Sequence, residues 1–115
     1  MSLVGNLGNE NMQTCLDECK KCLQACEECR TLCLREEDVK SMVKCIELLN
    51  DCIDVCDIAM KFMSRGSVHA KHVCKECAEI CDLCAQECGK MQTNHCKKCA
   101  EICRQCAEEC RKMAM

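Results

Sequence analysis

The sequence predicts an all-α protein: an antiparallel up-down-up-down four-helix bundle with a Cys-lined core. Three observations predict this fold for the 115 residues, taken as one domain. Most of the 19 cysteines follow one another at alternating steps of three and four residues, which places them along one face of an α-helix. Period two, the pattern of a half-buried strand, is absent throughout. The breaks between the periodic segments are short, and short links favour antiparallel neighbours.

The first expected element is a helix over about residues 12–34. Its six cysteines follow steps of 4, 3, 4, 3 and 4, so that residues eighteen apart return to the same side of the helix. These cysteines are Cys15, Cys19, Cys22, Cys26, Cys29 and Cys33. Residues 1–11 are expected to form an N-terminal arm or a short extra helix.

A second helix is expected over about residues 38–64. The break before it contains neither Gly nor Pro, and its acidic residues are the types favoured where a new helix begins. The same spacing continues with only three cysteines, Cys45, Cys52 and Cys56. Apolar residues such as Val39, Ile46 and Leu49 are expected to close the bundle beside the N-terminal half of this helix.

Helices three and four are expected over about residues 67–91 and 94–113. Gly66 and Ser67 provide a helix stop followed by a helix cap, and Thr93 or Asn94 provides the next cap. Residues 74–88 match residues 96–110 at 11 of 15 positions without a gap, so the two helices read as copies of one unit. The cysteines of these helices are Cys74, Cys77, Cys81, Cys84 and Cys88, then Cys96, Cys99, Cys103, Cys106 and Cys110.

Composition excludes several classes of function. The net charge is −3 and Phe62 is the one aromatic residue, so the chain offers neither a basic field nor stacking platforms for nucleic acid. No apolar run approaches the roughly 18 residues that a membrane span needs. The first residues lack the features of a signal peptide, so we expect a cytoplasmic protein whose thiols stay reduced. An odd number of cysteines also prevents complete intramolecular pairing.

The cysteine pattern favours metal binding over packing. Leu or Ile would bury more area than Cys at every core position, so a purely structural core would not select Cys throughout. Soft thiolates favour Cu(I), Zn(II) or iron–sulfur clusters. One Cu(I) per thiolate leaves the core nearly neutral, whereas Zn(II) with four thiolates carries −2 at each site, and no Lys or Arg lies in the cysteine frame to offset it.

Two functions remain as alternatives to the storage of Cu(I). The first is a zinc-binding or other soft-metal detoxification bundle, which would saturate near four or five zinc ions. The second is a thiol redox protein, although a thioredoxin-like site needs a βαβ context that the sequence lacks. None of the patterns requires a catalytic dyad, and we expect no enzymatic activity.

The repeated CxxCxxxCxxCxxxC frames, such as CKECAEICDLCAQEC and CKKCAEICRQCAEEC, resemble those of the bacterial copper storage proteins, in particular the cytosolic branch. The resemblance covers about residues 15–110. It implies a bundle that folds before metal arrives, assembles as a homotetramer and stores many Cu(I) ions, with all 19 cysteines as ligands at about one ion per Cys. A copper-delivering chaperone is a possible partner under the same resemblance.

Copper also needs a way into the bundle. The start of the first helix, the 64–67 turn and the end of the fourth helix are expected to meet at one end. Three methionines continue the cysteine frames there, and a further methionine and two histidines lie nearby in the sequence. The expected entrance residues are Met12, Met60, Met63, His69, His72 and Met113. The opposite end carries Met42, Met91 and His95 and is expected to be the closed one.

Overall fold

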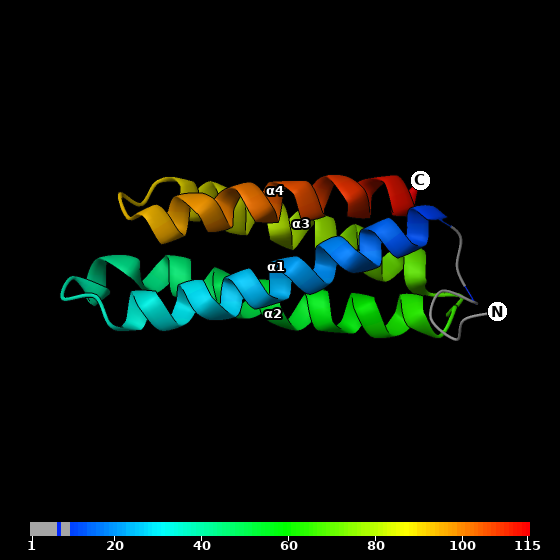
Figure 1. Cartoon of the computed structure of the whole chain (residues 1–115), viewed down its shortest axis with the longest axis horizontal. Coiled ribbons are helices and arrows are strands. Elements are labelled where there is room, and N and C mark those ends of the chain that lie inside the picture. The colour runs from blue at the N-terminus through cyan, green and yellow to red at the C-terminus, as the bar shows by residue number, and fades with distance from the viewer. Residues whose placement is uncertain (1–6, 8–9) are drawn as a thin grey trace.

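The computed structural model, which describes Leu7 and residues 10–115, is a bundle of four long helices (Figure 1). The fold class expected from the sequence is confirmed. The helices are α1 (Glu10–Leu34), α2 (Val43–Ser64), α3 (Ala70–Gly89) and α4 (Asn94–Ala114), with a short 3₁₀ helix, η1 (Val39–Met42), before α2. Each helix runs antiparallel to the next, and α1 also packs against α4, which closes the bundle.

The two ends of the bundle differ in what they contain. The start of α1, the α2–α3 turn and the end of α4 lie together at one end, which we call the terminal end (Figure 1). The α1–α2 and α3–α4 links lie at the opposite end, which we call the link end. The residues expected at the copper entrance therefore belong to elements of the terminal end.

Helix boundaries shift by a few residues from those expected. The helix expected over 12–34 already begins at Glu10, and the one expected over 38–64 begins as η1 before continuing as α2. The helix expected over 67–91 is shorter at both ends, spanning Ala70–Gly89, because residues 67–69 form a turn. Of the expected arm 1–11, Leu7 and the start of α1 are described and the rest lies outside the described residues.

Gly66 stops α2 in the way its sequence position predicts. Its φ of 63° is left-handed, a conformation that glycine adopts without a steric penalty. The amide of Ser67 donates to the carbonyl of Phe62 at 3.0 Å, and the amide of Gly66 donates to the carbonyl of Met63 at 3.1 Å. This pair of bonds is the Schellman motif, which satisfies carbonyls left free at the helix end.

Thr93 caps the N-terminus of α4. Its backbone is extended, and its hydroxyl accepts a hydrogen bond from the amide of Cys96 at 3.4 Å. A hydroxyl in this position satisfies one of the first amides of the helix, which have no partner within the helix. The cap fixes where the cysteine face of α4 starts.

The core of the bundle consists mainly of sulfur. The buried side chains are cysteines together with a few alanines and larger apolar residues, and among the described residues no polar or charged side chain is buried. Leu49 and Met63, both from α2, are the largest of the fully buried side chains. Small side chains on all four inner faces let the helices approach closely and point their thiols at one another.

Candidate metal centre

All 19 cysteines are buried and carry free thiols. None is more than 2% exposed. Six come from α1, three from α2 and five each from α3 and α4, as the alternating steps of three and four require. The inward placement of every thiol follows from a spacing that keeps each cysteine on the core face of its helix.

Thiols from different helices lie in contact at the terminal end. The Sγ of Cys110 on α4 lies 3.6 Å from the Sγ of Cys15 and 3.7 Å from that of Cys19, both on α1. The Sγ of Cys106, one helical turn earlier on α4, lies 3.7 Å from that of Cys19. Neighbouring turns of α4 therefore share the sulfur atoms of α1.

The same arrangement continues through the middle of the bundle. The Sγ of Cys22 lies 3.6 Å from that of Cys52 on α2 and 3.7 Å from that of Cys103 on α4. Cys26 lies one turn further along α1, with its Sγ 3.6 Å from that of Cys103 and 3.7 Å from that of Cys99. The thiols thus form a continuous column rather than isolated pairs.

Several sets of these sulfur atoms are close enough to share an ion. Within each set, the ligand atoms all lie within 4.8 Å of one another. The all-thiol sets are Cys19, Cys56, Cys77 and Cys106; Cys22, Cys52, Cys56 and Cys81; Cys22, Cys26, Cys52 and Cys103; and Cys15, Cys19 and Cys110. Because the sets overlap, one thiol can bridge two neighbouring ions. Such sharing of thiols suits a metal ion that accepts few ligands.

Burial and neighbouring thiols shift the cysteine pKa values in opposite directions. Hydrogen bonds from the thiols of Cys106 and Cys110 lower the pKa of Cys19, so a thiolate can be held there by its neighbours. At the link end, burial and then the neighbouring thiol of Cys96 raise the pKa of Cys33 to about 12. Thiols such as Cys33 therefore keep their protons near neutral pH until a cation replaces them.

The six residues expected at the copper entrance differ in exposure. Met63 is buried, and Met12, Met60 and Met113 are half-buried against the core. His69 and His72 are exposed, with ring centroids 6.4 Å apart. Neither His69 nor His72 belongs to the sets of clustered His, Cys, Asp and Glu side chains among the described residues.

His95, which lies outside the cysteine frames, is among thiols in the structure. Its Nδ1 lies 3.5 Å from the Sγ of Cys29 and 3.6 Å from that of Cys96, and its Nε2 lies 3.1 Å from a carboxylate oxygen of Glu36. Cys33 completes the cluster. The signal for His95 in the sequence is its position next to Cys96, at the start of a cysteine frame.

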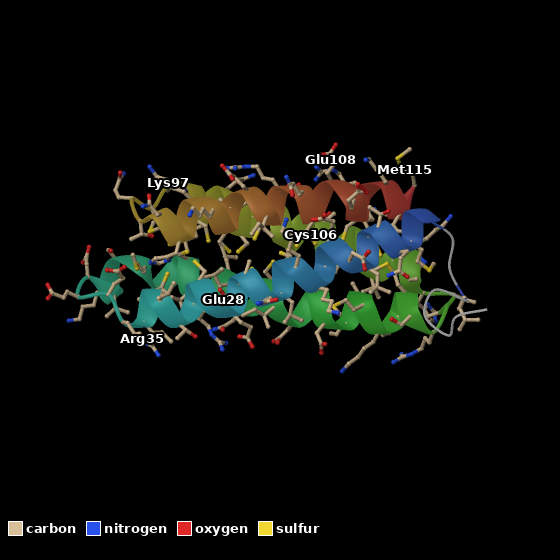
Figure 2. The ribbon with its side chains drawn as sticks, viewed as in Figure 1. Glu28, Arg35, Lys97, Cys106, Glu108 and Met115 are labelled. Atoms are coloured by element: carbon tan, nitrogen blue, oxygen red, sulfur yellow. The ribbon has the colours of Figure 1, made fainter. Side chains whose placement is uncertain are left out.

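Charged side chains cover the outside of the bundle. In Figure 2, the labelled Glu28, Arg35, Lys97 and Glu108 lie on the outer surface, whereas Cys106 lies among the helices. Glu28 and Glu108 are exposed, as expected for carboxylates away from the cysteine face. The thiol column is therefore enclosed by a solvated surface of mixed charge.

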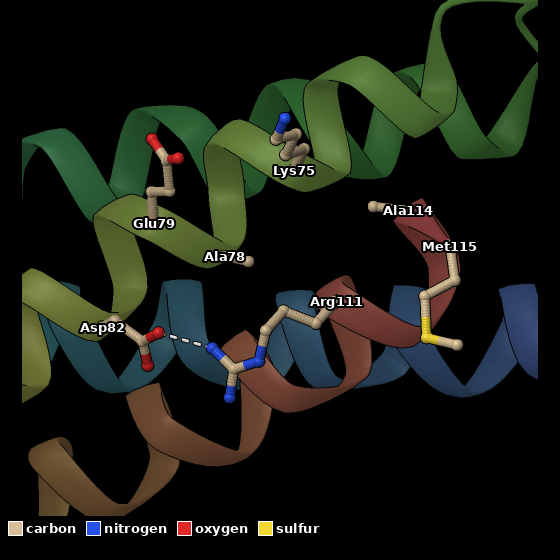
Figure 3. Close-up of a pocket in the computed structure, with 7 residues that line it drawn as sticks. All are labelled: Lys75, Ala78, Glu79, Asp82, Arg111, Ala114 and Met115. Carbon is tan, nitrogen blue, oxygen red and sulfur yellow. Dashed lines mark hydrogen bonds and ion pairs between the residues drawn. The ribbon is translucent and has the colours of Figure 1, made fainter.

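One groove on this surface lies between α3 and α4 near the terminal end. It has a volume of about 450 Å³ and is lined by residues that include Lys75, Glu79, Asp82 and Arg111. Figure 3 shows the ion pair between Asp82 and Arg111 that joins the two helices across it. No cysteine lines the groove, so it is separate from the thiol column.

None of the described helices has the length and apolarity needed to cross a membrane.

Comparisons with known proteins agree with this geometry. The Cu(I)-bound copper storage protein BsCsp3 is 40% identical, with a TM-score of 0.89 over 92% of this chain and 100% of that one. A cytosolic copper storage protein from Streptomyces lividans, with five coppers, is 36% identical, with a TM-score of 0.87 over 91% of this chain and 92% of that one.

A curated protein is also similar to this chain in sequence. The uncharacterized cysteine-rich protein YhjQ of Bacillus subtilis (strain 168) is 42% identical over 83 residues, which are 72% of this chain and 77% of the relative. The family described as copper storage protein, Csp, matches residues 8–115. With its buried thiols, its four-helix fold and this match over almost its whole length, the chain belongs to the copper storage protein family.

Proposed function

We propose that this protein stores many Cu(I) ions in the core of its bundle, with the thiolates of all 19 cysteines as ligands. The observation that carries the proposal is the buried column of free thiols contributed by all four helices. Cysteine sulfur is a soft ligand that selects cuprous copper. The Cu(I) bound to BsCsp3 and the coppers of the Streptomyces lividans protein support the same cargo.

Charge balance favours a monovalent ion over a divalent one for the column as a whole. Among the described residues no cationic side chain is buried, so thiolates in the core depend on the metal for neutralisation. One Cu(I) per thiolate restores neutrality throughout the column. Zn(II) in sets of four thiolates leaves −2 at each set, which is costly with no buried cation nearby.

We propose that copper enters at the terminal end. Met63 is buried in the core, Met12, Met60 and Met113 are half-buried against it, and His69 and His72 are exposed. All six belong to elements of the terminal end. Thioether and imidazole bind Cu(I) without first losing a proton, so they can pass an ion inward. Cys15 and Cys110, whose sulfur atoms lie 3.6 Å apart, are the first thiol pair that such an ion would meet.

We further propose that the protein works in the cytosol as a homotetramer, receives copper from a chaperone and catalyses no reaction. The Streptomyces lividans relative is a cytosolic copper storage protein, which supports the location. Apolar side chains left on the surface, such as Val43, Ile58 and Leu83, support contact with further subunits. Storage needs no catalytic group, and the carboxylates of Glu28 and Glu108 lie in solvent.

Anaerobic titration of the fully reduced protein tests the stored cargo. With Cu(I) delivered in the presence of a competing cuprous chelator, binding is expected to reach on the order of twenty equivalents per chain, about one for each thiol. Replacing Cys22, Cys52 and Cys103 by Ala should lower the capacity by about three equivalents while the helical circular dichroism spectrum is retained. Saturation at only a handful of cuprous ions would contradict the proposal.

The entrance is tested by the rate of loading rather than by its extent. Replacing Met12, Met63 and Met113 together by Leu keeps apolar side chains of similar size. The variant should take up copper from a weak cuprous donor several-fold more slowly and reach the same final capacity, in stopped-flow absorbance measurements. The control replaces Met42 and Met91 at the link end by Leu. An effect of the control variant alone would move the entrance to the link end.

A further inference from the structure

We propose that the turn between α2 and α3, at the terminal end of the bundle, is a docking surface for an anionic lipid membrane. We call the surface formed by residues 61–75 the basic tip. Docking through the basic tip is reversible and leaves the bundle folded outside the bilayer. The inference goes beyond the proposed function, because it concerns where the protein is held rather than what it stores.

The basic tip is rich in cations in a chain that is acidic overall. The net charge of the whole chain is −3. Residues 58–75, however, contain no Asp or Glu and four cationic side chains, Lys61, Arg65, Lys71 and Lys75. All four side chains are exposed. Positive charge is therefore concentrated at one place on a surface of otherwise mixed charge.

Most of this positive charge is not neutralised by neighbouring carboxylates. Lys61 pairs with Asp57 on α2, with its Nζ 3.2 Å from a carboxylate oxygen. None of the other three cations of the tip has an ion-pair partner among the described residues. At the adjoining end of α4, Arg111 and Lys112 are each paired with a carboxylate. The unpaired cations at the terminal end therefore lie on the α2–α3 turn and the start of α3.

An exposed apolar side chain lies between these cations in the chain. Val68 is 89% exposed and follows Gly66, whose left-handed backbone ends α2. A valine side chain gains free energy when it leaves water for an apolar environment. The boundary between headgroups and acyl chains can bury Val68, while Arg65 and Lys71 on either side of it contact anionic headgroups.

The position of the tip favours a membrane over other anionic partners. Figure 1 shows that α2 and α3 meet at one end of the rod-shaped bundle, so their turn can meet a broad surface end-on. A protein partner would need an acidic hollow to receive it. Nucleic-acid bases need aromatic side chains to stack on, and the ring of Phe62 is covered by Arg65, whose guanidinium carbon lies 5.1 Å from the ring centroid.

A basic cluster of this size gives selective but weak binding. Each Lys or Arg near an anionic membrane strengthens binding by about fivefold. Three unpaired cations should therefore give a preference on the order of a hundredfold for anionic over neutral lipid. The attraction falls off within a Debye length of about 10 Å at 0.1 M salt, so added salt should weaken it. The thiols stay buried, and docking leaves the capacity for Cu(I) unchanged.

Co-sedimentation of the reduced, copper-free full chain with vesicles in 0.1 M salt tests the docking surface. Vesicles of equal parts phosphatidylglycerol and phosphatidylcholine should bind the chain on the order of a hundredfold more strongly than phosphatidylcholine alone. Replacing Lys71 and Lys75 together by Gln should weaken binding to the anionic vesicles roughly 25-fold, about fivefold for each charge. Val68→Ser should weaken it several-fold without changing the dependence on salt.

The matched control replaces Lys97 and Lys98 by Gln, which removes two exposed cations from the link end. These charges lie about the length of α4 from the tip, well beyond the Debye length, so binding should stay within about twofold of the parent. All variants are compared at equal helical content by circular dichroism.

The inference is overturned if anionic vesicles bind the chain no better than neutral ones, or if the control variant loses as much binding as the Lys71 and Lys75 variant. Binding to poly-glutamate without binding to vesicles would also overturn it and would assign the tip to an acidic protein partner. Cu(I) capacity is measured separately, so failure of the docking surface leaves copper storage standing.

Discussion

Cys33 shows how burial couples a thiol proton to the stability of the fold. Its Sγ lies 3.5 Å from that of Cys96 in a fully buried position, and burial raises its pKa from 9.0 to about 12. Below pH 9 the folded and unfolded chains both keep this proton. Between pH 9 and 12 the unfolded chain loses the proton while the folded chain retains it, so stability falls as the pH rises.

Urea unfolding of the reduced, copper-free protein at pH 8, 9 and 10 measures this effect. The free energy of unfolding should fall with pH above 9, with each such thiol contributing at most about 1.4 kcal/mol per pH unit. Cys33→Ala should make the dependence shallower, because one proton difference is removed. Stability that rises from pH 9 to 10 would contradict the assignment.

Leu49 stabilises the fold by filling space in the core with a large side chain. It is fully buried and one of the largest core side chains in a bundle whose other core positions are mostly cysteine or alanine. Leu49→Ala should cost about 2–5 kcal/mol, because small neighbours cannot fill the space left behind. Chemical denaturation measures the cost. The exposed Leu34 provides the control, with a change to Ala expected within about 0.5 kcal/mol.

At the scale of elements, the stop of α2 depends on the backbone of Gly66. A Cβ added there would meet Leu7 atoms only at 3.7 Å, which is ordinary contact, so the cost of a substitution is conformational. Gly66→Ala should destabilise the bundle by about 1 kcal/mol, since the left-handed penalty exceeds the gain from a less flexible unfolded chain.

Gly89→Ala is the matched control in thermal unfolding. Its φ is not left-handed, and the added Cβ would approach the flexible end of the Arg104 side chain at 3.1 Å. Alanine is favoured over glycine within a helix, so this variant should be as stable as the parent or slightly more so. Equal losses from the two substitutions would show that crowding, rather than backbone conformation, sets the cost.

At the scale of the whole molecule, stored copper should stabilise the bundle. Each ion joins sulfur atoms that belong to different helices, as the contacts of Cys22 with Cys52 and Cys103 illustrate. Ligands that bind only the folded state raise its stability by mass action. Anaerobic thermal scans should give a Tm that rises steadily with added Cu(I) up to the full capacity. A Tm that falls during loading would indicate that the ions bind the unfolded chain.

The sequence by itself determined the four helices and which of their faces turn inward. A spacing of three and four residues places all the cysteines of a helix on one face. This face is expected to be buried, because the opposite face carries the charged residues. The stop at Gly66 and the cap at Thr93 follow from local backbone chemistry in the same way. Local geometry was enough for these features.

Only the tertiary structure decided which sulfur atoms meet across helices and where His95 points. The contacts of Cys33 with Cys96 and of His95 with Glu36 join residues about 60 positions apart, and a repeat with near-identical turns gives no register for such pairs. The axial alignment of α1 against α4 sets them, and this alignment depends on how all four helices pack. The mixed thiol–imidazole cluster therefore emerged only when the helices were brought together.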